Sequence, residues 1–178
     1  MLKAPKFWYN KNDTIYSNAL YPFSLLFRFG TKVRNLLSTE KYSPIPIICI
    51  GNIVVGGAGK TPVSMKIAKI LIEAGYKPNF ITKGYSGIIK DSTLVKSWHS
   101  PTSVGDESLL LSKIASTWIG NDRIKSSVLA KKNGADCLIM DDGFQNLSVA
   151  KDFSIVVVDG EQEFGNKRVM PSGPLRES

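Results

Sequence analysis

Cysteine, histidine and acidic residues are scarce in this sequence. Its 178 residues include two cysteines, one histidine (His99), and 15 Asp and Glu residues against 23 Lys and Arg. Cys49 and Cys137 both fall in predicted strands, so we expect buried thiols in a reduced, cytosolic protein and no disulfide framework. We expect His99 to be a surface residue. No small-residue cleavage site follows the N-terminus, which argues against a secretory signal peptide.

Long apolar runs are missing as well. The apolar run from Ala19 to Phe29 is shorter than the roughly 20 residues that a membrane-spanning helix needs, and Pro22 and Arg28 interrupt it. There is also no internal repeat and no low-complexity linker. The length therefore suits one domain, or a domain with an appendage, that buries a core of its own.

Positive charge and aromatic residues gather near the N-terminus. Basic residues with Trp, Phe and Leu are typical of an amphipathic helix that lies on an anionic membrane surface, and we predict this for residues 1–42. The alternative is a helix packed on the domain with an exposed basic face. Nucleic-acid binding is not expected, because no recognition motif accompanies the charge. The charged residues of this segment are Lys3, Lys6, Lys11, Arg28, Lys32, Arg34 and Lys41, against Asp13 and Glu40.

The chemistry of residues 54–61, VVGGAGKT, is that of a phosphate-binding loop. An Ile-rich run from Ile45 to Ile50 precedes it and helical spacing follows Pro62, so the loop joins a predicted strand to a predicted helix. Glycines let the backbone approach an anion, and the helix N-terminus supplies free N–H groups. The usual pattern has glycine where Val54 stands, so a glycine-rich connecting turn is the alternative. The predicted nucleotide-binding residues are Val54, Val55, Gly56, Gly57, Ala58, Gly59, Lys60 and Thr61, with Lys60 on the β- and γ-phosphates and Thr61 on Mg²⁺.

A pair of aspartates, Asp141 and Asp142, follows the apolar run from Cys137 to Met140. An aspartate at the carboxyl end of a neighbouring strand is how phosphate-loop proteins hold Mg²⁺, so either residue is a candidate ligand. The alternative is a turn with solvated acids, since Asp-Asp-Gly favours turns.

The chain alternates between strand-like and helix-like segments after the loop. Strands are predicted at 79–82, more weakly at 93–95, at 137–140 and within 153–160, with helices after Val104 and at 123–133. This alternation predicts an α/β fold with a mostly parallel, doubly wound sheet over residues 43–178, with ligands at the carboxyl ends of the strands.

Three motifs together resemble one family. They are GNIVVGGAGKTP (51–62), VGDESLLL (104–111) and DDGFQN (141–146), joined by PKFWY (5–9), TKGYSG (82–87) and MPSGPLRES (170–178). The combination resembles the tetraacyldisaccharide 4′-kinases of lipid A synthesis in Gram-negative bacteria. The resemblance implies transfer of the γ-phosphoryl group of ATP, with Mg²⁺, to the 4′-hydroxyl of an acylated disaccharide 1-phosphate. It also implies peripheral attachment to the cytoplasmic face of the inner membrane.

The resemblance also implies roles that the residues alone do not. It makes Asp106 the base that accepts the proton of the attacking hydroxyl, and Arg176 an arginine near the transferred phosphate. With Lys60, these are the three expected catalytic residues. Without the resemblance, Asp106 and Glu107 would be an acidic first turn that favours the helix dipole, and Arg176 one basic loop residue.

Four departures from the family pattern qualify the resemblance. Lys83, Ser108 and Asn146 stand where the family usually has arginine, proline and histidine. Family members are also longer and continue past PLRES with a histidine thought to assist the catalytic aspartate. We therefore expect a truncated form of the fold that needs a separate polypeptide carrying the C-terminal half, or a nucleotide-binding remnant without efficient phosphoryl transfer. A switch-like ATPase or GTPase is disfavoured, because no N/T-K-x-D segment is present.

Overall fold

The computed structural model describes residues 4–10 and 14–177, which divide into two compact units. Unit 1 combines Met1–Ser38, Asn52–Gly59 and Val156–Ser178, and unit 2 combines Thr39–Gly51 with Lys60–Ile155. The division into residues 1–42 and 43–178 stays a prediction. Lys3, Lys11 and Asp13 of the basic segment, and Ser178 of the last motif, lie outside the described residues.

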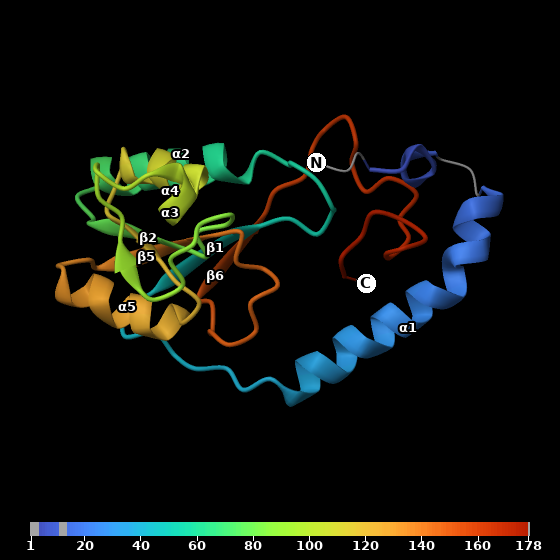
Figure 1. Ribbon diagram of the computed structural model, residues 1–178, viewed down its shortest axis with the longest axis horizontal. Helices are drawn as coiled ribbons and strands as arrows, with labels where there is room; N and C mark the ends of the chain where they lie inside the picture. Colours follow the sequence, from blue (N-terminus) through green and yellow to red (C-terminus); the bar gives the residue numbers. More distant parts are fainter. Residues whose placement is uncertain (1–3, 11–13, 178) are drawn as a thin grey trace. The chain divides into compact units, whose positions relative to one another are not determined.

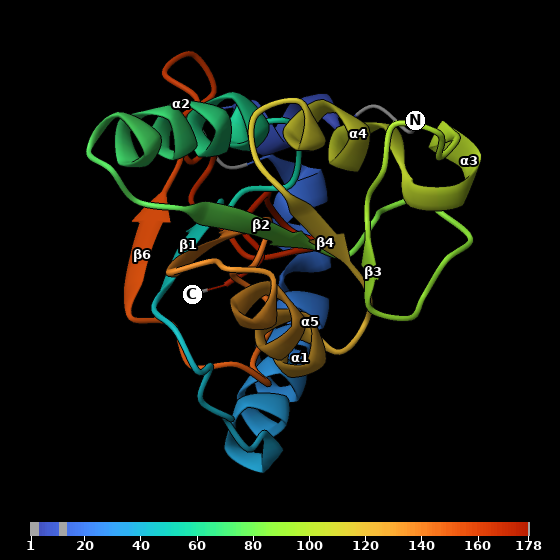
Figure 2. The ribbon, with the colours of Figure 1, turned by 90° about the vertical axis from the view of Figure 1, so that its left-hand side faces the viewer.

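A six-stranded sheet organises unit 2 and continues into β6. The strand order is β3-β4-β2-β5-β1-β6; β1 pairs with β5, β5 with β2, and β2 with β4 in parallel, whereas β3 is antiparallel to β4. Helices α2 and α4 cover one face of this sheet and α5 covers the other (Figure 2). The strands are β1 (Ile47–Gly51), β2 (Pro78–Thr82), β3 (Thr93–Leu94), β4 (Thr117–Ile119), β5 (Cys137–Asp141) and β6 (Phe153–Val156); the helices are α2 (Lys60–Glu73), α3 (Pro101–Val104), α4 (Asp106–Ser112) and α5 (Arg123–Lys132).

This architecture confirms the predicted α/β fold with a mostly parallel sheet. Each predicted strand is present within two residues of its expected start, and α4 opens after Gly105 as expected. Strand β4 and helix α3 were not predicted. Both are very short, and Thr117–Ile119 becomes a strand by pairing with β2, which lies more than thirty residues earlier in the chain.

The core of unit 2 forms where helices cover both faces of the central strands. Every residue of β2 and β5 is buried, which suits the continuous apolar runs that parallel strands carry. Cys49 and Cys137 lie in this core as free cysteines, in accord with the sequence-based expectation. Burial raises the pKa of the Cys49 thiol to about 11 and that of Cys137 to about 12.

Unit 1 contains the N-terminal helices and the C-terminal segment (Figure 1). A short 3-10 helix, η1 (Lys6–Tyr9), precedes α1 (Ile15–Leu37), which extends beyond the apolar run that drew attention in the sequence. Thr14 and Ser17 form a capping box that satisfies free N–H groups at the start of α1. Among the described residues, no helix has the length and apolar character needed to cross a membrane.

Candidate functional site

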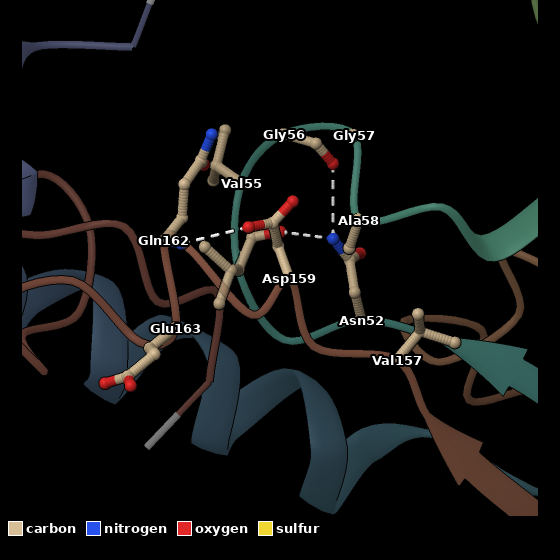
Figure 3. Close-up of a pocket in the computed structure, with 10 residues that line it drawn as sticks. Asn52, Val55, Gly56, Gly57, Ala58, Val157, Asp159, Gln162 and Glu163 are labelled. Atoms are coloured by element: carbon tan, nitrogen blue, oxygen red, sulfur yellow. Dashed lines mark hydrogen bonds between the residues drawn. The ribbon is translucent and has the colours of Figure 1, made fainter.

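The glycine-rich loop Asn52–Gly59 of unit 1 is held from beneath by Asn52. This side chain is fully buried, and its Nδ2 donates to the Val54 carbonyl at 2.7 Å and to the Gly56 carbonyl at 3.2 Å (Figure 3). Gly56 and Gly59 have φ values of 131° and 76°, which side chains rarely tolerate. A Cβ at either position would meet no heavy atom within 4 Å, so conformation and not crowding requires glycine there.

Val54 occupies its non-standard position because the loop pairs with the C-terminal segment. It is 7% exposed and forms an antiparallel bridge with Leu175, while the Val55 N–H donates to the Pro174 carbonyl at 2.8 Å. The Arg176 N–H donates to the Ile53 carbonyl at 2.8 Å, which places Arg176 beside the loop in the same unit. A buried, paired residue here needs a valine and not a flexible glycine.

An open pocket borders the outer side of this loop in unit 1 (Figure 3). It is lined by loop residues and by the turn after β6, where the Asp159 carboxylate accepts the N–H groups of Glu161 and Gln162, each at 2.9 Å. With the carboxylates of Asp159 and Glu163 on its wall, this pocket is electrostatically unfavourable for phosphate.

In unit 2, the carboxyl end of β5 faces the first turn of α2. The Asp141 carboxylate is 3% exposed and accepts the Thr61 hydroxyl at 3.0 Å and the Ser64 hydroxyl at 2.7 Å. Burial raises the pKa of Asp141, and the neighbouring charge of Asp142 adds to that effect, while the two hydroxyl hydrogen bonds oppose it. A buried carboxylate with raised pKa gains from a cation beside it.

Asp142 and Lys60 form the second contact of this turn. The Lys60 Nζ lies 3.3 Å from the Asp142 Oδ1, with the lysine side chain 13% and the aspartate side chain 48% exposed. Asp142 has a φ of 53°, a left-handed conformation that aspartate tolerates better than most residues and that turns the chain sharply after β5. The two aspartates therefore hold different partners: Asp141 the hydroxyls and Asp142 the ammonium group.

The acidic turn of α4 lies near this carboxylate pair. Gly105, with a φ of 86°, separates α3 from α4, and Asp106 and Glu107 form the exposed first turn of α4. The pKa of Glu107 is raised, first by partial burial of its carboxyl group and then by the charges of Asp141 and Asp142. Ser108 stands where the family usually has proline, and its buried hydroxyl has hydrogen-bond partners. The hydroxyl lies 2.6 Å from the Val104 carbonyl and 2.8 Å from the Gly105 carbonyl.

The donor set at Thr61 and Asp141 fits Mg²⁺ and does not fit a metal held by protein alone. Within residues 4–10 and 14–177, no three His, Cys, Asp or Glu side chains converge as a metal site. Mg²⁺ typically takes one or two protein oxygens and completes its shell with water and phosphate oxygens. A hydroxyl and a buried carboxylate in hydrogen-bond contact offer those oxygens.

The structure thus groups the predicted residues into two sets. Unit 2 brings together Lys60, Thr61, Asp141 and Asp142, with Asp106 on α4, and unit 1 brings Arg176 to the loop Val54–Gly59. Sequence analysis missed Asn52 and Ser64. Ser64 could have been found, because three residues after Thr61 it lies on the same face of α2; the fold of the loop over Asn52 leaves no comparable signal.

Comparison with known proteins identifies the family. The family model for tetraacyldisaccharide-1-P 4′-kinase, LpxK, matches residues 16–178. The chain is 48% identical to the tetraacyldisaccharide 4′-kinase of Paramagnetospirillum magneticum and 44% identical to that of Jannaschia sp.. Each match covers 99% of this chain and 54% of the relative, so the chain spans about half the length of these relatives.

A solved structure agrees with these matches. The crystal structure of LpxK from Aquifex aeolicus in complex with ATP superposes with a TM-score of 0.79 at 30% identity, over 92% of this chain and 55% of that one. The chain therefore shares its fold with a solved LpxK over most of its length. The chain belongs to the tetraacyldisaccharide 4′-kinase family.

Proposed function

We propose that this chain binds ATP and Mg²⁺ and transfers the γ-phosphoryl group to the 4′-hydroxyl of a tetraacyldisaccharide 1-phosphate, as the names of its relatives indicate for them. The observation that carries the proposal is the contact between α2 and the end of β5, where Lys60 meets Asp142 and Thr61 meets Asp141. This is the lysine, hydroxyl and aspartate set with which phosphate-loop proteins hold nucleotide and metal.

The roles follow from charge and position. The N–H groups of Gly56–Gly59 would bind phosphate oxygens, because the Val55 N–H is already bonded to the Pro174 carbonyl. Lys60, which contacts Asp142 in this structure, would bind the β- and γ-phosphates. Thr61 and Asp141 would hold Mg²⁺, and Asp142 would add a second carboxylate beside Asp141. When bound, Mg²⁺ neutralises charge that develops on the phosphate oxygens.

Asp106 is the proposed general base, and Arg176 a cation for the transferred group. Asp106 is exposed at the N-terminus of α4, so an incoming hydroxyl can reach its carboxylate. Its proton acceptance comes late in phosphoryl transfer, where positioning matters more than basicity. Glu107 next to it has a pKa raised first by burial and then by the charges of Asp141 and Asp142, and it is the natural comparison for Asp106.

We further propose that α1 lies on the surface of the inner membrane, on its cytoplasmic face. The helix exposes a row of large apolar side chains, among them Ile15 at 86%, Leu26 at 68%, Phe29 at 68% and Leu37 at 79%. It carries Arg28, Lys32 and Arg34 as well, and a helix that combines these features binds anionic lipid surfaces. The acceptor is itself a lipid, so attachment brings the site to its substrate.

The test separates transfer from binding. Label from γ-labelled ATP should appear in the acylated disaccharide in mixed micelles, and Asp106→Asn should lower the rate by about a hundredfold or more while MgATP affinity stays the same. Glu107→Gln is the matched control and should retain most of the rate. MgATP binding by the unchanged chain without transfer, with or without a polypeptide supplying the family's C-terminal half, would instead support a nucleotide-binding function alone.

A further inference from the structure

Within unit 1, helix α1 contacts the C-terminal segment through two buried serines. Ser17 and Ser24 are 1% and 2% exposed, and they lie seven residues apart, about two turns, on one side of the helix. Leu26 lies about 200° around the helix from Ser24 and is exposed. The docked side of α1 therefore carries the two buried serines beside the half-buried Leu20 and Phe27, and the opposite side exposes large apolar side chains.

The serines bind the backbone of the C-terminal segment Val169–Ser172. The Ser24 hydroxyl donates to the Val169 carbonyl at 2.8 Å and accepts the Ser172 N–H at 3.0 Å, and the Ser172 hydroxyl donates to the Ser17 carbonyl at 2.6 Å. All three hydrogen bonds are buried and join positions at least 145 residues apart in the chain. Two further contacts from the N-terminal region flank them: Trp8 Nε1 donates to the Pro171 carbonyl at 3.0 Å, and Arg168 stacks 5.4 Å from the Tyr21 ring.

The segment that α1 holds continues directly to the phosphate loop. The Met170 N–H donates to the Leu175 carbonyl at 2.9 Å, and the Leu175 N–H donates to the Arg168 carbonyl at 3.0 Å, so residues 168–175 close on themselves. Pro174, Leu175 and Arg176 then pair with Val55, Val54 and Ile53 of the loop. A continuous hydrogen-bonded path therefore runs from Ser24 through Ser172 to the loop, entirely inside unit 1.

We infer that Ser24 and Ser172 are positioning residues for the nucleotide: they hold the segment that fixes the phosphate loop and Arg176. The inference rests on the proposed function, since it assigns the path to ATP binding. A Cβ added at Gly56, Gly57 or Gly59 would meet no heavy atom within 4 Å, so packing around these glycines does not fix the loop. The paired arm Ile53–Val55, together with the Asn52 side chain, orients it. Loss of the Ser24 hydrogen bonds makes that arm more mobile. MgATP affinity then falls, because the N–H groups of the loop are no longer held in one orientation before the phosphates bind.

The first measurement is MgATP binding by calorimetry. Ser24→Ala removes two hydrogen bonds and should weaken MgATP binding about fivefold, which corresponds to about 1 kcal/mol, part of what those two bonds contribute. Ser17→Ala is the matched control: it removes a buried hydroxyl from the same helix and its capping box, but keeps the Ser17 carbonyl that accepts from Ser172. It should destabilise α1 and leave MgATP affinity unchanged.

The second measurement needs no nucleotide. Hydrogen exchange at the amides of Val55 and Arg176 should accelerate in Ser24→Ala and in Ser172→Ala, but not in Ser17→Ala. Unchanged exchange and affinity in Ser24→Ala, or equal losses in all three variants at equal loss of stability, would overturn the inference. If Ser24→Ala accelerates exchange but the unsubstituted chain binds no MgATP, the serines do hold the loop. In that case their role in nucleotide binding is refuted together with the proposed function.

Discussion

Helices α1 and α2 both bury serines, and they do so for different purposes. On α2, Ser64 donates to the Asp141 carboxylate, so the buried hydroxyl belongs to the candidate metal site. On α1, Ser24 bonds backbone groups of Val169 and Ser172, so the buried hydroxyl fixes the position of a chain segment.

The rest of each helix shows the same contrast. The docked side of α2 also buries Ala68, a small apolar residue that lets the helix approach the sheet, and its exposed Ile70 and Ile72 are 50% and 44% accessible. The exposed side of α1 carries large apolar side chains such as Leu26 and Phe29 instead, which departs from the usual amphipathic arrangement of a surface helix. The comparison indicates that α2 contributes side chains to the candidate nucleotide site, whereas α1 presents an exposed apolar surface.

The largest effect should come from the site end of α2. Lys60→Ala removes a charged phosphate contact and should weaken MgATP binding by about 2 kcal/mol or more. Calorimetry with MgATP measures it, with Lys66→Ala on the same helix as the control. Unchanged affinity in Lys60→Ala would refute the assignment of the loop and of Lys60.

The apolar side of α1 provides the next test. Phe29→Ser should weaken binding to vesicles containing anionic lipid about tenfold, since it removes a large apolar side chain from the proposed interface. Ile70→Ser on α2 is the matched control, and its binding to vesicles should not change. Equal losses in the two variants, measured by cosedimentation, would show that α1 has no special role at the membrane.

The smallest effect concerns the stability of the buried carboxylate. Because the pKa of Asp141 is raised in the folded protein, its ionised form opposes folding at neutral pH, and this cost disappears as the pH falls through the folded-state pKa. Asp141→Asn should therefore stabilise the metal-free protein at pH 7, with the gain fading as the pH falls through the folded-state pKa. It should also abolish any stabilisation by Mg²⁺ with ATP.

Urea unfolding at pH 7 and at pH 4 measures both parts of that expectation. Ser64→Ala serves for comparison, because it removes a hydroxyl that stabilises the ionised Asp141 and should shift stability in the opposite direction. If Asp141→Asn destabilises the protein at pH 7, the hydrogen bonds from Thr61 and Ser64 outweigh the cost of burying the charge.

Much of the fold could be predicted from local sequence, and local sequence also supplied the residues proposed for the site. Glycine at 56 and 59, lysine and threonine at the start of a helix, and two aspartates after an apolar strand each have a chemistry that depends on near neighbours in the chain. The same holds for β1, β2 and β5, whose continuous apolar runs suit a sheet covered on both faces. The family resemblance added the expectations for Asp106 and Arg176, whose roles remain proposals.

What only the tertiary structure decided depends on contacts between distant segments. The sequence by itself determined the strand, glycine loop and helix, and the aspartate pair, because backbone conformation and hydrophobic periodicity are local properties. Strand β4, the burial of Val54 against Leu175, and the docking of α1 by Ser17 and Ser24 were decided by pairing across the chain. A serine in an aromatic, basic helix carries no local sign of its partner, since the Val169 carbonyl that it binds is 145 residues away.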